Sequence, residues 1–130
     1  MNPEIKELWC QALESGEYKQ GSGYLKQFVV CPGPYEGIRH CCLGVLCDLA
    51  VKQGVRIYVE DMSGVIKFDR QLSALPASVM AWAGLDSADP YVNVDNPRFS
   101  IGDSKRSPLS GLNDNGTDFK TIAGLIRKNL

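Results

Sequence analysis

The sequence predicts an α+β fold, a single small domain with about four helices packed around a small antiparallel sheet or hairpin. At 130 residues the chain has a common domain size, so one domain over residues 1–130 is expected. Segments with helical periodicity alternate with short runs of β-branched residues, and two such runs flank a hairpin turn. The sequence lacks repeated βα units, which argues against a doubly wound parallel sheet.

Two helices and one strand are expected in the first half of the chain. Asn2 is a good N-cap, Pro3 suits the first helical turn, and apolar residues then recur at helical spacing as far as Gly16. A polar, glycine-punctuated loop follows, and a segment with two prolines breaks the chain after the strand. The expected elements are a helix at 3–15, a loop at 17–23, a strand at 24–30, a break at 31–37 and a helix at 41–53 that ends at Gly54.

The second half predicts a hairpin followed by shorter helices. β-branched residues on both sides of Asp61-Met62-Ser63-Gly64 indicate the hairpin. Thr117 is expected to cap the last helix, because Phe119 begins an apolar stripe at helical spacing. The expected elements are strands at 55–60 and 65–69, a helix at 75–84, an irregular region or poorer hairpin at 90–107 around Asp95-Asn96-Pro97, a helical turn from Ser107-Pro108 and a final helix at 119–130.

Composition and charge limit the possible functions. Hydrophobic residues make up 44% of the chain and charged residues 22%, as in ordinary soluble proteins. The 14 basic and 15 acidic residues are interspersed, so no basic surface for a nucleic-acid backbone is expected. The N-terminus has no apolar signal region, and the longest uncharged apolar run is only residues 41–47. We therefore expect a soluble intracellular protein that does not enter a membrane.

The stretch CCLGVLC places three cysteines within residues 41–47, directly after the only histidine, His40. An odd total of five cysteines without a signal peptide favours free, buried thiols over disulfides. On a helix Cys42 and Cys47 point about 140° apart, so they do not converge on a zinc ion. Cys41 at a helix start is a candidate nucleophile, but His40 is its immediate neighbour and is expected at the surface or the helix start. No metal or cofactor is expected.

Gly44 stands out in the same helix. Glycine inside a helix costs about 1 kcal/mol relative to alanine, so a close approach along the side of Cys41, Gly44 and Asp48 is expected. A neighbouring strand or helix is the favoured explanation, and a ligand is the alternative.

Four blocks of the sequence together resemble a known family. They are Ser15 to Gly21 (SGEYKQG), His40 to Ala50, Leu75-Pro76 with Trp82 to Asp86 and Pro90, and Leu109 to Ile126. Their order resembles an uncharacterised family of small tailed-bacteriophage and prophage proteins with the patterns E-Y-x-Q-G, C-C-L-G-V-L-C-D-L, L-P-x-x-V-x-x-W-A-G-L and L-N-D-x-G-x-x-F-x-x-I-A. The resemblance leaves out the hairpin and residues 91–107. It implies a phage accessory protein in the host bacterial cytoplasm, and because the family is uncharacterised no catalytic residue can be carried over from it.

This resemblance leads to the hypothesis of a non-catalytic accessory binding protein with an anti-defence role. It would sequester a small signalling nucleotide or block a host defence protein. The candidate ligand-binding residues are polar and lie in loops next to apolar blocks, namely Tyr18, Lys19, Gln20, Asn113 and Asp114. One alternative is a cysteine-dependent enzyme that uses Cys41. A second is a DNA-binding regulator, against which the balanced charge argues, and a homo-oligomer stays open.

Two loops resemble ligand sites only superficially. Gly21-Ser22-Gly23 lacks the third glycine and the lysine of a phosphate-binding loop, so a flexible turn is favoured. Asn113-Asp114-Asn115-Gly116 lacks the oxygen ligands of a calcium loop and is read as a turn.

Overall fold

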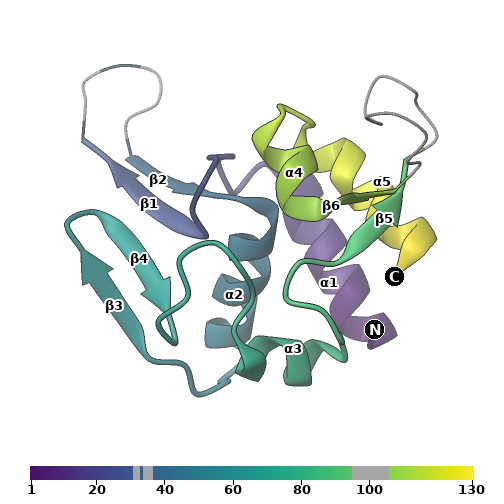
Figure 1. Cartoon of the computed structure of the whole chain (residues 1–130), viewed down its shortest axis with the longest axis horizontal. Coiled ribbons are helices and arrows are strands. Elements are labelled where there is room, and N and C mark those ends of the chain that lie inside the picture. The colour runs from purple at the N-terminus through teal and green to yellow at the C-terminus, as the bar shows by residue number, and fades with distance from the viewer. Residues whose placement is uncertain (31–32, 34–36, 95–105) are drawn as a thin grey trace.

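The computed structural model describes residues 1–30, 33, 37–94 and 106–130. It confirms the α+β fold, with five helices and six short strands among these residues (Figure 1). In chain order the elements are α1 (Pro3–Glu14), β1 (Lys26–Val29), β2 (Gly37–His40), α2 (Cys42–Lys52), β3 (Val59–Met62), β4 (Val65–Phe68), α3 (Ala77–Ala83), β5 (Tyr91–Asn93), β6 (Arg106–Pro108), α4 (Leu109–Asp114) and α5 (Phe119–Asn129).

The main sheet is antiparallel and has the strand order β2-β1-β4-β3. Its predicted hairpin is confirmed, and both turn residues, Ser63 and Gly64, have positive φ angles of 55° and 93°. Two consecutive positive φ angles form the tight turn whose twist matches that of the flanking strands. At the other edge, Gln20 makes a parallel bridge to His40, so the segment after α1 covers part of β2.

Helix α2 lies between the main sheet and helices α1, α4 and α5 (Figure 1). Every residue from Cys42 to Cys47 is buried, because neighbouring elements cover several sides of the helix. The indole Nε1 of Trp9 on α1 donates to the carbonyl of Cys42 over 2.9 Å. The stretch CCLGVLC at residues 41–47 therefore lies at the centre of the hydrophobic core.

Gly44 is in contact with another backbone, as the favoured interpretation expected. A Cβ atom at Gly44 would lie 1.6 Å from the carbonyl oxygen of Leu25, just before β1. Real Cβ atoms do not approach that closely, so only glycine lets α2 pack at this distance from the sheet. The close approach is made by a neighbouring chain segment and not by a ligand.

Helices α1 and α5 pack against each other on the opposite side of the molecule from the sheet (Figure 1). Asn2 caps α1 as predicted, and its Oδ1 accepts from the amide of Glu4 over 2.9 Å. Arg127 of α5 bridges to Glu7 at 3.0 Å and to Glu14 at 2.6 Å on α1. These exposed ion pairs join the two ends of the chain.

Two local predictions were wrong, and a third holds in part. Asp118, not Thr117, caps α5, since its Oδ1 accepts from the amide of Thr121 over 2.8 Å, while Thr117 is buried. His40 is only 6% exposed and ends a strand, β2, which the sequence did not predict. The helical turn expected from Ser107-Pro108 is present, because Pro108 is the N-cap of the short helix α4, but both residues also belong to β6 and the helix itself begins at Leu109.

Strands β5 and β6 pair in the region expected to be irregular or a poorer hairpin. The predicted turn at Asp95-Asn96-Pro97 lies outside the described residues. Over the described part of the chain, no helix combines the length and apolar character needed to cross a membrane.

Candidate functional site

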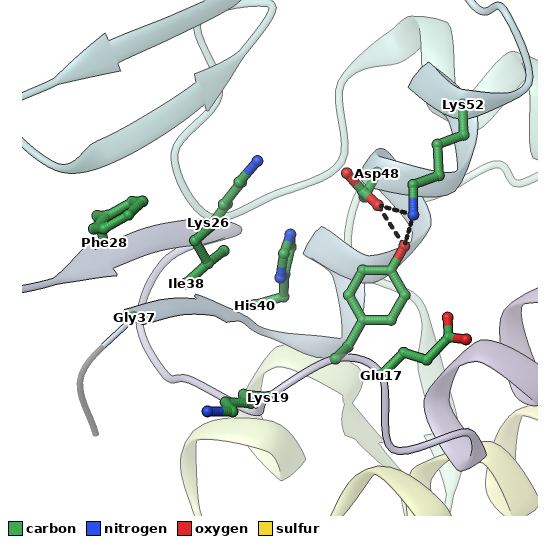
Figure 2. A pocket seen from close by; sticks show the side chains of 10 residues that line it. Glu17, Lys19, Lys26, Phe28, Gly37, Ile38, His40, Asp48 and Lys52 are labelled. Atoms are coloured by element: carbon green, nitrogen blue, oxygen red, sulfur yellow. Dashed lines mark hydrogen bonds and ion pairs between the residues drawn. The ribbon is translucent and has the colours of Figure 1, made fainter. Parts of the chain in front are cut away.

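The largest of the described pockets, about 600 Å³, opens between the β1–β2 face of the sheet and the C-terminal half of α2. We call it the sheet–helix pocket (Figure 2). Pockets that hold small molecules have volumes in this range. It is lined by Glu17, Tyr18, Lys19, Lys26, Phe28, Gly37, Ile38, His40, Asp48 and Lys52.

The sheet supplies one wall through strand alternation. Lys26 and Phe28 lie two residues apart on β1, and their partners on β2 are His40 and Ile38. Successive side chains of a strand point to opposite faces, so these four share one face. Phe28 and Ile38 remain 53% and 43% exposed, whereas His40 is buried at the end next to α2. The wall therefore changes from apolar and open to polar and enclosed.

Helix α2 and the segment after α1 supply the other wall. Asp48 and Lys52 are one helical turn apart, and Lys52 Nζ lies 3.2 Å from Asp48 Oδ2. The Tyr18 hydroxyl donates to the same carboxylate oxygen and accepts from Lys52 Nζ over 3.1 Å. Tyr18, Asp48 and Lys52 are thus bonded to one another, and Figure 2 shows Asp48 and Lys52 at one end of the pocket. They form a fixed polar end wall.

This hydrogen-bonded cluster shifts the ionisation of all three groups. Burial opposes the charge on Asp48, but hydrogen bonds from Tyr18 and Lys52 hold its pKa below the ordinary value. The pKa of Lys52 is raised by its bonds to Tyr18 and Asp48. Burial and the bond to Asp48 raise the pKa of Tyr18. At neutral pH the cluster is thus a neutral phenol beside a paired carboxylate and ammonium.

His40 carries a buried polar atom that no described group satisfies. Its Nε2 is inaccessible to solvent and has no hydrogen-bond partner. The ring packs edge-on against Tyr18, with centroids 5.0 Å apart, and Figure 2 shows it between Lys26 and Asp48. Burial lowers the pKa of His40 to about 4, so the imidazole is neutral at pH 7. An unsatisfied buried nitrogen on a pocket wall calls for an explanation.

The five predicted ligand-binding residues are divided between two pockets. Tyr18 and Lys19 line the sheet–helix pocket. Gln20, Asn113 and Asp114 line a second pocket of about 360 Å³, which also contains side chains from the opposite face of β1 and β2. The sequence placed all five in one site because it could not show that the 18–20 segment runs along a strand edge.

The side chains of Gln20 and Asn113 are hydrogen-bonded to each other and to the backbone. Gln20 Nε2 donates to Asn113 Oδ1 over 2.9 Å and to the carbonyl of Thr117 over 2.8 Å. Asn113 is 3% exposed, accepts from the amide of Cys42 over 3.1 Å and donates to the carbonyl of Gly21 over 2.8 Å. Together they hold the loop after α1 against the start of α2, which is a structural role.

The Gly21-Ser22-Gly23 loop is likewise held by internal bonds. The amide of Gly21 donates to the carbonyl of His40 over 2.8 Å, and the amide of Gly23 donates to Asp114 Oδ1 over 3.0 Å. A phosphate cradle needs free amides, so these bonds argue against one here.

Cys41 is poorly suited to act as a nucleophile. It is the N-cap of α2, is 4% exposed, and its sulfur accepts from the amide of Gly44 over 3.4 Å. Burial raises the pKa of its thiol to about 11, which outweighs the effect of the helix start. Cys10, Cys42 and Cys47 are also free and buried, while Cys31 lies outside the described residues. Within the described ranges, no three metal-ligating side chains gather into a site.

Sequence reasoning missed His40, Asp48, Lys52, Lys26 and Phe28 as pocket residues. Two signals were available. Lys26 and Phe28 alternate within the predicted strand, and Asp48 follows Gly44 by one helical turn, on the side where the close approach was expected. Neither signal shows that the two surfaces face each other.

A family model for a Domain of unknown function (DUF8296) matches residues 1–130 of the chain. No curated protein and no solved structure matches it.

Proposed function

The chain belongs to the DUF8296 family, and we propose that it is a non-catalytic protein that binds and sequesters a small phosphate-bearing ligand of the nucleotide class. The observation that carries this proposal is the unpartnered Nε2 of His40 on the wall of the sheet–helix pocket. A bound ligand would satisfy this nitrogen, which otherwise costs free energy on folding. The pocket has the size of a small-molecule site.

The charges around the pocket support an anionic ligand. Lys52 and Asp48 form an ion pair, and the lining residues together include three lysines but only two carboxylates. Lys26 shares the pocket face of the sheet with His40, and among the described residues it makes no ion pair. A neutral His40 beside it does not change this balance, so the pocket is positive by about one charge.

The exposed end of the pocket supports a ligand that is also partly apolar. Phe28 and Ile38 form a cross-strand pair on the pocket face, and both remain substantially exposed. Exposed aromatic side chains on a sheet face are stacking platforms for nucleobases. A nucleotide combines a planar base with phosphate and therefore suits both ends of the pocket.

The biological setting is part of the same proposal. Two of the blocks that resemble phage proteins supply the end wall of the pocket, since Tyr18 comes from the first block and Asp48 from the second. We place the protein in the host bacterial cytoplasm, where sequestering a signalling nucleotide would counter host defence. The raised pKa of Cys41 argues against the alternative of an enzyme that uses this thiol as its nucleophile.

The test is a thermal-unfolding series with nucleoside mono-, di- and triphosphates and with linear and cyclic dinucleotides. A ligand at one hundred times its Kd stabilises the folded state by about 2.7 kcal/mol, which raises Tm by several degrees. Lys26→Gln should abolish the shift, whereas Lys67→Gln, a strand lysine on the opposite sheet face, should keep it. A flat response across the series contradicts the proposal and favours a protein partner.

A further inference from the structure

We infer that the ligand is a nucleoside monophosphate, with its base on Phe28 and its single phosphate held between Lys26 and the imidazole of His40. This inference rests on the proposed function and adds to it the number of phosphates, the position of the base and the roles of three residues. Three observations support it: the order of Phe28, Lys26 and His40 along the sheet face, the positive charge of Lys26, and the Nε2 of His40 in the pocket wall.

The spacing of the two binding elements is set by the strand. Lys26 and Phe28 are two residues apart on β1, which separates their Cα atoms by roughly 7 Å along the strand. Figure 2 shows Phe28 at one end of the pocket, Lys26 next to it and His40 beyond. The ligand must therefore carry an aromatic ring and an anion as near neighbours. A base and its own 5′-phosphate are such a pair.

The number of platforms favours one base. Among the described aromatic side chains that line the pocket, only Phe28 offers an open ring face. Tyr18 is fixed by its hydrogen bonds to Asp48 and Lys52. Its ring is in edge contact with the ring of His40, so neither of these two rings is open for stacking. The exposed rings of Tyr24, Tyr58 and Tyr91 do not line this pocket. A second base of a dinucleotide would find no platform among the described residues.

The charge favours one phosphate. Lys26, which makes no ion pair among the described residues, supplies the positive charge next to His40, and the Asp48 carboxylate lies on the other side of His40 (Figure 2). A second or third phosphate would approach that carboxylate and be repelled. Lys52 offsets Asp48 but is held by it at 3.2 Å. Hence a monophosphate fits the balance of charges better than a triphosphate.

His40 supplies the directional contact. Its Nε2 is buried and unpartnered, and in the tautomer protonated there it donates one hydrogen bond to a phosphate oxygen. Hydrogen bonds to a charged acceptor in a water-poor site are stronger than neutral ones. The ring is held in place by Tyr18, and the backbone amide of His40 donates to the carbonyl of Lys19 over 2.9 Å. The donor is thus oriented before a ligand arrives.

The experiment uses the fact that the chain has a single histidine, so one imidazole Cε1–H signal reports the site. The protein is titrated by NMR and calorimetry with AMP, GMP, CMP and UMP, and in parallel with ribose 5-phosphate, adenosine, inorganic phosphate, ATP and cyclic di-AMP. At least one monophosphate should shift the His40 signal at the lowest concentration of the series. Ribose 5-phosphate and adenosine should each bind at least tenfold more weakly, because each lacks one of the two contacts.

Two variants assign the contacts, the first with a matched control variant and the second with a folding check. Phe28→Ala should weaken the affinity for the monophosphate about tenfold and leave the affinity for ribose 5-phosphate unchanged. The control is Tyr58→Ala, because Tyr58 is an exposed aromatic residue outside the pocket, and it should change neither affinity. His40→Gln should weaken every phosphate ligand, and its folding is checked by the amide spectrum.

The outcomes separate this inference from the proposed function. Tighter binding of ATP or cyclic di-AMP than of any monophosphate overturns the inference and leaves the proposed function standing. Equal affinity for ribose 5-phosphate and the monophosphate overturns the placement of the base on Phe28. If no phosphate ligand shifts the His40 signal or Tm, both fail.

Discussion

The two ends of helix α2 differ in how their polar groups are satisfied. At the N-terminal end, Cys41, Gly44 and the amide of Cys42 have fixed partners within the chain, from Leu25 and Asn113. At the C-terminal half, Asp48 and Lys52 face a pocket whose opposite wall contains His40, whose Nε2 has no hydrogen-bond partner among the described residues. One end is closed by packing and the other is left open. We therefore infer that the cysteine-rich start of α2 stabilises the fold, whereas the polar side chains at its other end are free to contact a ligand.

The largest expected effect is at the closed end, in the substitution Gly44→Ala. The new methyl group would overlap the carbonyl of Leu25, so either α2 or β1 must move. We expect a loss of about 3–5 kcal/mol in the free energy of unfolding, measured by urea denaturation. Gly124→Ala on α5 is the control, because its Cβ meets nothing within 4 Å, and it should add roughly 0.5–1 kcal/mol. Equal behaviour of the two variants would show that the close approach is absent.

A somewhat smaller effect is expected for Asn113→Ala. This change leaves the amide of Cys42 and the carbonyl of Gly21 buried without their partner and frees Gln20. The expected loss of unfolding free energy is about 2–4 kcal/mol. Asn115→Ala, exposed just after α4, should change it by less than about 0.5 kcal/mol. If Asn113→Ala keeps its stability but loses nucleotide binding, the residue belongs to a site and not to the closed end.

At the open end of α2, the burial of His40 should make the free energy of unfolding depend on pH. Burial holds the pKa of His40 at about 4 in the folded chain, against 6.5 when unfolded. The unfolded chain thus takes up this proton first, and the free energy of unfolding falls as pH decreases from 6.5 to 4, by up to roughly 3 kcal/mol. Asp48, whose pKa is lowered, adds its own loss only below about pH 4.

Urea denaturation between pH 7 and pH 4 checks this expectation. His40→Gln should remove most of the fall in unfolding free energy between pH 7 and pH 4. The further loss of stability below about pH 4 should remain. An unchanged slope in the variant would mean that other groups cause it.

The helices of this protein were largely predictable because their signals are local. Asn2 and Pro3 start α1, Gly84 ends α3 with a φ of 71°, and the hairpin follows from Ser63 and Gly64. Strand β2 was missed because it has four residues and follows a segment rich in glycine and proline. The cap of α5 was placed one residue early because Thr117 and Asp118 are both good caps.

The site was predictable only in part. Tyr18 was chosen as a polar residue in a loop, and it lies in the pocket wall. Gln20 and Asn113 were chosen for the same reason, yet they bond to each other across 93 residues of sequence. A polar side chain in a loop is equally suited to bind a ligand or to fix the loop, and only its partners decide between these roles.

The fold class, the main helices, the hairpin and the need for glycine at position 44 follow from the sequence, because propensity, capping and helical periodicity act over a few residues. Three features follow only from the packing of distant segments: the contact of Leu25 with Gly44, the burial of His40 Nε2 without a hydrogen-bond partner among the described residues, and the position of Lys26, Phe28 and Asp48 around one pocket. These features depend on residues far apart in the chain, and their positions follow from the packing of α2 against the sheet.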